Sequence, residues 1–157
     1  MRTPLLAGNW KLQAGTRAEA LSLAGAVAKG CAGLTGRDVM IAPPFPVLRD
    51  VHQAVAGSPV AVASQDLYWE RNGAFTGEVS AAMVADTGCR YAIVGHSERR
   101  QFFGETDYTV AKKAAAAAAC CRRGSSSCQC WSARRGERRR RLAPGACAAA
   151  GSCWSSD

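Results

Sequence analysis

The densest group of ionisable side chains in the sequence directly follows a short apolar run. Residues 91–94 read Tyr-Ala-Ile-Val, which is typical of a buried strand, and Gly95 then gives the backbone the freedom to turn. The ionisable residues come next: His96, Glu98, Arg99, Arg100 and Glu105. A rigid strand that ends in a polar loop holds such side chains in place while they reach a ligand. The run therefore predicts a catalytic or binding loop after residue 94.

Alternating strands and helices are expected to position this loop. The sequence predicts strands at 5–11, 38–42, 60–64 and 90–94, and helices at about 17–30, from Pro46 onward, at 80–86 and at 108–119. Thr16 and Asp107 are the expected N-caps of the first and last helices. A polar loop of roughly fifteen residues follows the third strand, and loops of this length are usually functional.

The short, continuous apolar strands favour an α/β fold with a parallel sheet and right-handed crossovers. Two architectures fit this pattern, an open doubly wound sheet and a closed (β/α)8 barrel, and spacing alone does not separate them. No G-x-G-x-x-G follows the first predicted strand, which argues against a dinucleotide-binding sheet.

Five segments together resemble the triose-phosphate isomerase family, in the family's order and spacing. They are Ala7-Gly-Asn-Trp-Lys11, Ala42-Pro-Pro-Phe-Pro46, Ser64-Gln-Asp66, Gly73-Ala-Phe-Thr-Gly-Glu-Val79 and Val94-Gly-His-Ser-Glu-Arg-Arg100. The resemblance covers about residues 3–118. It implies the first four β/α units of a (β/α)8 TIM barrel, a fold that typically needs ~250 residues. It also implies a cytoplasmic enzyme of glycolysis and gluconeogenesis that interconverts the triose phosphates dihydroxyacetone phosphate and D-glyceraldehyde 3-phosphate without a cofactor.

The resemblance implies a role for each matching polar residue. Lys11 would face the substrate phosphate and the developing enediolate, and Asn9 would help to orient the same oxygens. His96 would polarise the substrate carbonyl as a neutral imidazole, a use of histidine for which this family is itself the standard example. Taken alone, without the other motifs, Asn9 and Lys11 would be polar residues at a strand end, and His96 would be an ordinary hydrogen-bonded histidine.

Supporting residues and a second subunit are implied in the same way. Ser97 and Glu98 would support the site, Glu98 by pairing with Lys11 or Arg99. The long loop after the third strand would reach into a second subunit, where Thr76 would support the neighbouring site at the dimer interface. The resemblance therefore implies a homodimer.

Composition divides the chain near residue 120. The whole chain carries a formal charge of +8, but residues 1–119 hold 12 basic and 10 acidic side chains and so contribute only +2. Residues 120–157 hold eight arginines, two acidic residues and six of the eight cysteines, with Leu142 as their one aliphatic core former. Such a segment buries too little apolar surface to offset the entropy cost of ordering it. We therefore predict a domain at residues 1–119 and a disordered Arg/Cys-rich tail at residues 120–157.

A one-base slip in the reading frame explains this tail. Residues 128–135 can be encoded by TGC CAG TGC TGG TCG GCG AGA CGC, and the same bases read one position earlier, after a G, give Val-Pro-Val-Leu-Val-Gly-Glu-Thr. That peptide resembles the fifth strand of the family and the Val-Gly-Glu that follows it. The hypothesis is a frameshift between about Ala114 and Ser127, so that the tail is out of frame.

Two other functions for the tail stay open at the level of sequence. The run from Arg134 to Arg141 could bind nucleic acid non-specifically through phosphate contacts. Cys128 and Cys130 could bind zinc together with Cys120 and Cys121, but no C-x₂-C pair or histidine accompanies them. We expect neither a metal nor nucleic acid as a partner. No apolar run approaches the ~18–20 residues of a membrane span, so no membrane partner is expected either.

The groups that would complete the reaction are not recognisable in the tail. Isomerisation needs a base that moves a proton between adjacent carbons. In the family this base is a glutamate after the sixth strand, and the loops after strands seven and eight bind the phosphate. Glu137 lies among arginines with no strand before it, so this role is not assigned to it. The chain as written is therefore predicted to be an inactive, truncated half-barrel.

Overall fold

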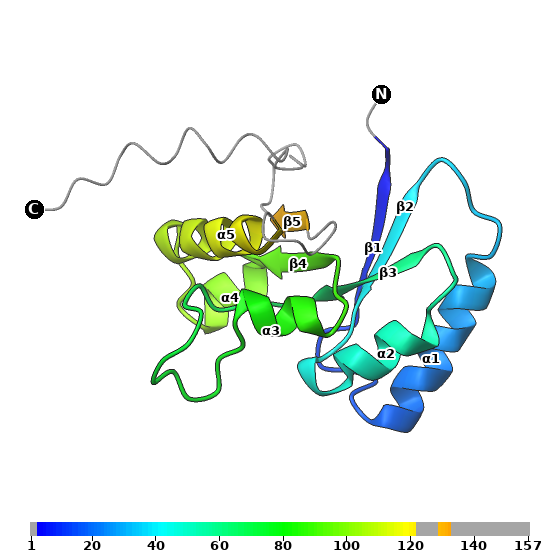
Figure 1. Cartoon of the computed structure of the whole chain (residues 1–157), viewed down its shortest axis with the longest axis horizontal. Coiled ribbons are helices and arrows are strands. Elements are labelled where there is room, and N and C mark those ends of the chain that lie inside the picture. Colours follow the sequence, from blue (N-terminus) through cyan, green and yellow to red (C-terminus); the bar gives the residue numbers. More distant parts are fainter. Residues whose placement is uncertain (1–2, 122–128, 133–157) are drawn as a thin grey trace, which may run out of the picture.

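The computed structural model describes residues 3–121 and 129–132 (Figure 1). Strands and helices alternate along the chain as the sequence predicts. The strands are β1 (Leu5–Asn9), β2 (Asp38–Ala42), β3 (Val60–Ser64), β4 (Tyr91–Val94) and β5 (Gln129–Ser132). The helices are α1 (Arg17–Gly30), α2 (Leu48–Ala54), α3 (Ala81–Asp86), α4 (Ser97–Phe102) and α5 (Asp107–Cys121), and a 3₁₀ turn, η1 (Phe45–Val47), precedes α2.

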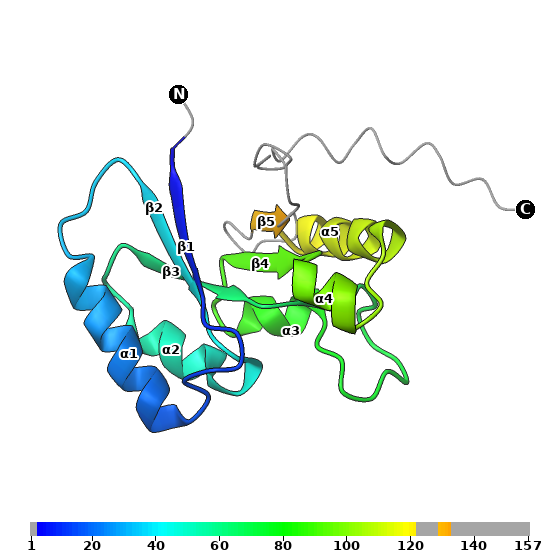
Figure 2. The ribbon, with the colours of Figure 1, turned by 180° about the vertical axis from the view of Figure 1, so that it is seen from behind.

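The strands form one parallel sheet in the order β1-β2-β3-β4-β5. Each strand pairs with its successor in the sequence, as in a barrel, whereas the strand order of a doubly wound sheet reverses part-way. Figures 1 and 2 show the sheet turning between β3 and β4, with α1 and α2 beside the first three strands and α5 beside β4 and β5. The arrangement confirms the predicted β/α units and decides between the two architectures in favour of a barrel arc.

Each face of the sheet carries its own cluster of buried side chains. Alternate residues of a strand point to opposite faces. Val39 and Ile41 of β2 pack with residues of α1 and α2, such as Ala24. Met40 and Ile93, each 1% exposed, belong to a second cluster that consists of strand residues only. The inner face of the arc therefore packs on itself in the described structure, and this packing is consistent with its curvature.

Local signals set the ends of the first and last helices. Thr16 caps α1 as predicted, since its hydroxyl accepts from the Glu19 N–H while the Glu19 carboxylate accepts from the Thr16 N–H. Asp107 is not the N-cap of α5 but its first helical residue. Thr106 takes that place: its hydroxyl accepts from the Thr109 N–H at 3.3 Å, and the Thr109 hydroxyl accepts from the Thr106 N–H at 2.9 Å. The prediction for Asp107 was therefore wrong by one residue.

Regular structure continues past the boundary predicted at residue 119. Helix α5 runs to Cys121, and β5 pairs with β4 in parallel register, from Tyr91 with Gln129 to Val94 with Ser132. Strand β5 has no counterpart among the predicted elements, because Gln-Cys-Trp-Ser contains no β-branched residue and pairing with a neighbour overrides weak propensity. Residues 122–128 and 133–157 lie outside the described structure, and with them the arginine-rich run at 134–141 and Glu137.

Candidate active site

The carboxyl ends of β1 and β4 bring together the residues singled out in the sequence. Asn9 ends β1 and Lys11 follows it, while Gly95 and His96 follow β4. Parallel strands end at the same edge of the sheet, which is the edge where barrels carry their chemistry. The Nζ atom of Lys11 donates to Oε1 of Glu98 at 2.6 Å, although the two residues are 87 positions apart. This contact joins the first and fourth β/α units.

The backbone of Lys11 is held in an unusual conformation. Its φ of +55° lies in the left-handed region, which a non-glycine residue adopts only when its surroundings enforce it. The Lys11 N–H donates to Oδ1 of Asn9 at 2.9 Å. The Gln65 side chain donates from Nε2 to the carbonyls of Lys11 and Ala42, each at 2.9 Å. The turn explains why β1 ends at Asn9 rather than at residue 11, and it directs the Lys11 ammonium to Glu98.

His96 is the N-cap of α4, and its ring acts as the capping group. The Glu98 N–H donates to Nδ1 of His96 at 3.2 Å. A ring nitrogen that accepts a backbone proton carries none itself, so a neutral His96 has its proton on Nε2. The Glu98 carboxylate also lies 3.5 Å from Nδ1. The backbone contact is shorter, and that carboxylate is already bonded to Lys11, so the Nε2–H tautomer fits the geometry best.

Glu98 serves as the counter-ion of Lys11. The hydrogen bond from Lys11 lowers the pKa of the Glu98 carboxyl, and the positive charge of Lys11 acts in the same direction. Both side chains of this pair are about half exposed. Exposed ion pairs contribute little to folding, so its importance lies in where it puts the ammonium. Arg99, the other partner expected for Glu98, pairs instead with Asp66 at 2.9 Å.

Ser97 and Thr76 are the remaining residues that the sequence singles out. Ser97 is the exposed first residue of α4. Thr76 lies in an exposed turn of the long loop after β3. Neither residue belongs to the hydrogen-bonded group of Lys11, Glu98 and His96 among the described residues, and their supporting roles remain predictions.

Sequence reasoning missed the residues that hold the site from behind. Gln65 occurs within one of the quoted motifs, but nothing in its spacing indicates that it joins the ends of β1 and β2. A buried ionic cluster links Asp66, Arg99, Glu105 and Lys113. Lys113 lies in an alanine-rich helix that reads as a surface element, and only the fold brings it to the two acidic side chains.

The arrangement is able to stabilise a negatively charged intermediate. Lys11 supplies a positive charge, and a neutral His96 supplies an Nε2–H donor because its Nδ1 accepts from Glu98; both side chains are held before any ligand binds. The amide nitrogen of Asn9 remains a donor, because Oδ1 is the atom that accepts from Lys11. Preorganised donors of this kind lower the energy of developing oxyanions.

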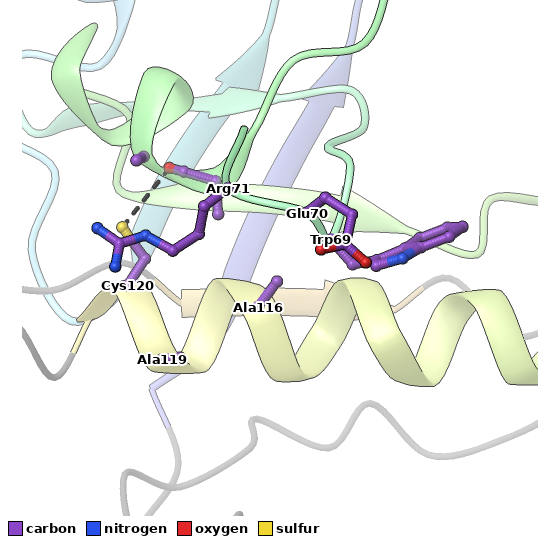
Figure 3. A pocket seen from close by; sticks show the side chains of 8 residues that line it. Trp69, Glu70, Arg71, Ala116, Ala119 and Cys120 are labelled. Atoms are coloured by element: carbon purple, nitrogen blue, oxygen red, sulfur yellow. Dashed lines mark hydrogen bonds between the residues drawn. The ribbon is translucent and has the colours of Figure 1, made fainter. Parts of the chain in front are cut away.

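A pocket between the long loop after β3 and α5 lies away from these residues. It has a volume of about 320 Å³ and is lined by Trp69, Glu70, Arg71, Ala81, Ala82, Ala116, Ala119 and Cys120. Figure 3 shows Trp69, Glu70 and Arg71 on one side and the small side chains of α5 on the other. None of the predicted site residues lines it, whereas the polar groups of Asn9, Lys11 and His96 converge at the strand ends.

Comparison with known proteins agrees with this geometry. The family model described as triosephosphate isomerase matches residues 4–141, well over half of the chain. The chain belongs to the triosephosphate isomerase family. The match extends past Cys120 into the segment that contains β5.

The relatives of this family member are about twice as long as the region they share with it. The triosephosphate isomerase of Endomicrobium trichonymphae is 50% identical over 113 residues, which are 72% of this chain and 45% of that protein. The triosephosphate isomerase of Pelobacter propionicus is 51% identical over 113 residues, which are again 72% of this chain and 45% of that protein. The crystal structure of triosephosphate isomerase from Bartonella henselae superimposes with a TM-score of 0.70 at 33% identity, covering 76% of this chain and 48% of that one.

Residues 3–121 and 129–132 hold neither a cluster of possible metal ligands nor a helix that could span a membrane. Within these ranges no three His, Cys, Asp or Glu side chains gather as a metal site would require. None of the helices described there is long and apolar enough to cross a bilayer.

Proposed function

We propose that this chain carries the N-terminal half of a triosephosphate isomerase active site. The reaction would interconvert dihydroxyacetone phosphate and D-glyceraldehyde 3-phosphate through an enediolate. The observation that carries the proposal is the junction of Lys11, Glu98 and His96 at the carboxyl ends of β1 and β4, where 2.6 Å separates Lys11 Nζ from Glu98 Oε1.

Each polar group has a distinct task in this reaction. His96 donates from Nε2 to the substrate carbonyl and so draws electron density toward that oxygen. Lys11 balances the negative charge of the phosphate and of the enediolate. Asn9 fixes the Lys11 turn with its oxygen and offers its amide nitrogen to the same substrate oxygens. Such groups raise the rate most when they are in place before the charge develops.

The proton transfer itself requires a base, and the described acidic side chains near His96 are already committed. Glu98 is bonded to Lys11, and Glu105 is buried against Lys113. The family resemblance assigns the base to a glutamate after a sixth strand. We therefore propose that these 157 residues alone do not turn over triose phosphates, and that the family's activity needs the later strands as well.

A slipped reading frame would account for this incompleteness. The similarity to the curated relatives supports the proposal, since it covers only 72% of this chain although those relatives are more than twice as long as the shared region. Sequencing the coding DNA across codons 110–135 tests it. We expect a one-base shift to open a frame that encodes strands five to eight; confirmed DNA with no such frame would contradict the slip.

The family resemblance extends the proposal to a cytoplasmic homodimer that acts in glycolysis and gluconeogenesis. Exposed aromatic side chains support the dimer. Phe75 of the long loop, Phe102 at the end of α4 and Phe103 directly after it are 42%, 67% and 68% exposed. Aromatic side chains are enriched at protein–protein interfaces, and Thr76 lies beside Phe75. Analytical ultracentrifugation of a frame-restored protein would test the dimer, and a monomer at micromolar concentration would contradict it.

A further inference from the structure

Four charged side chains form a nearly buried cluster directly behind the candidate active site. The Asp66, Glu105 and Lys113 side chains are 6%, 2% and 5% exposed, and that of Arg99 is 32% exposed. Lys113 Nζ donates to both oxygens of Asp66, at 2.7 and 2.8 Å, and also to Oε1 of Glu105. Arg99 Nε lies 2.9 Å from Asp66 Oδ2 and 3.4 Å from Glu105 Oε1. Two negative and two positive charges therefore balance within the cluster.

The cluster reaches the active site through the peptide groups of Gly95. The Gly95 N–H donates to Oε2 of Glu105 at 2.9 Å, and Nε of Arg100 donates to the Gly95 carbonyl at 3.1 Å. Side chains therefore hold both polar groups of this residue. Gly95 has a φ of +69°, and a Cβ there would lie 3.0 Å from both Val110 methyl groups. Because Gly95 immediately precedes His96, its backbone angles set where the imidazole lies.

Stability alone does not explain such a cluster. Burying charges costs desolvation energy that their mutual attraction often only offsets, and apolar side chains of similar size frequently serve as well. The arrangement does explain how the Glu105 carboxylate is oriented toward Gly95. Lys113 and Arg99 occupy Oε1 of Glu105, which leaves Oε2 directed at the Gly95 N–H.

We propose that Glu105, held by Lys113 and Arg99, is a positioning residue that fixes the Gly95 backbone and thereby the direction and tautomer of His96. Its catalytic significance rests on the proposed isomerase function, but the orientation of His96 is a property of the free chain. Glu105 itself touches no substrate. The ion pairs with Lys113 and Arg99 keep the carboxylate of Glu105 from rotating away.

Nitrogen-15 NMR of the 157-residue chain under reducing conditions tests this proposal without substrate. The chain contains two histidines, so His52→Gln assigns the signals of the His96 ring. In the parent chain we expect the Nε2–H tautomer and a Gly95 amide protected from hydrogen exchange. In Glu105→Met we expect that amide to exchange about tenfold faster or more, as for the loss of a charge-assisted hydrogen bond. The His96 ring signals should move toward the tautomer mixture of free imidazole.

Two further variants separate positioning from a general loss of structure. Glu105→Gln keeps one oxygen for the Gly95 N–H but loses the charge, so the His96 tautomer should be retained although the chain is less stable. Asp86→Asn removes the charge from an exposed pair of 2.7 Å with Arg49 and should change neither readout. If Glu105→Met does not fold, Glu105→Gln decides: a mixed tautomer in its folded state overturns the proposal.

Three other results would overturn it. The first is a parent chain whose Gly95 amide exchanges at the unprotected rate. The second is a folded Glu105→Met chain with unchanged His96 signals, and the third is an equal change in Asp86→Asn. None of these results depends on isomerase activity, so a failure here is distinguishable from a failure of the proposed function.

Discussion

Lys11 depends on more distant parts of the chain than any other predicted site residue does. Its left-handed backbone is held by Asn9 and Gln65, and its ammonium is held by Glu98. An exposed lysine on a flexible stem would lose much side-chain entropy when it bound an anion. Fixing both backbone and side chain in advance reduces that cost, and it explains why this position tolerates a strained φ.

Removing the Lys11 ammonium or the His96 imidazole should lower the rate of isomerisation without unfolding the protein. In a frame-restored protein we expect Lys11→Met and His96→Gln each to lower kcat by about 10²–10³, the usual cost of losing one preorganised group. His52→Gln, which changes an exposed histidine on α2, should leave kcat unchanged. A steady-state assay with both trioses measures this. Full kcat/KM in Lys11→Met or His96→Gln would mean that the role belongs to another residue.

The buried thiol of Cys89 gives a pH dependence of known sign. Burial raises the pKa of Cys89 from its ordinary 9.0 to about 11. The unfolded chain therefore releases this proton before the folded chain does. The stability linked to the thiol is fully present below about pH 9 and is lost as the pH rises through about 11. The full loss would amount to about 3 kcal/mol.

Comparison with Cys89→Ala isolates this effect, because all other groups titrate alike in both chains. Urea unfolding under reducing conditions, between pH 8 and pH 11, gives the two free energies of unfolding. We expect the difference between the parent and Cys89→Ala to shift against the parent as the pH rises. A constant difference would contradict the shifted pKa.

At the scale of elements, the turn from β4 into α4 is the most tightly specified. Gly95 has a positive φ and lies against Val110 of α5. Any side chain there is strained by the backbone and also clashes with a buried neighbour. The strand, the turn and the following helix therefore depend on one another through this single residue.

Gly95→Ala should consequently lower the free energy of unfolding more than an alanine does at an equally strained position with open space around it. Gly57 has a φ of +80° with no atom within 4 Å of its Cβ position, so Gly57→Ala should cost only the backbone term of about 1–2 kcal/mol. We expect Gly95→Ala to cost about 1–3 kcal/mol beyond that through overpacking. Urea unfolding of both variants measures the difference. In a Val110→Ala background the excess should fall away, and an excess that persists would contradict the steric explanation.

Pattern alone recovers most elements but not what joins them. The bounds predicted for α1, β2 and β3 agree with the structure, because apolar periodicity and turn residues are local signals. The identity of α5 was predicted, but its cap fell one residue away because Thr106 and Thr109 cap it reciprocally. Strand β5 was missed, since its pairing with β4 outweighs the weak strand propensity of its residues.

Of the candidate site, too, the sequence predicts one part, and only the fold reveals the other. The spacing of Asn9, Lys11 and His96 indicates strand ends, and the family resemblance links them. Gln65 and Lys113 act across the sheet on residues far away in the sequence. No local pattern encodes such contacts, so only the fold reveals them.

At the scale of the whole molecule, the described strands form an arc of a barrel rather than a closed one. Among residues 3–121 and 129–132, β1 pairs with β2 alone. The residues of β1 are correspondingly exposed or half-buried, and Leu6 is 50% exposed. The chain spans about 45% of the length of the curated relatives that it matches. Further strands that closed the barrel would cover this edge.

The isomerase assay of a frame-restored protein, set beside the 157-residue chain, tests the central claim most directly. Both proteins are purified under reducing conditions and assayed with dihydroxyacetone phosphate and glyceraldehyde 3-phosphate. We predict that the restored protein interconverts the two trioses with a dependence on His96, and that the 157 residues alone show no turnover above background. A folded restored protein without activity, or turnover by the 157-residue chain that His96→Gln abolishes, would contradict the account.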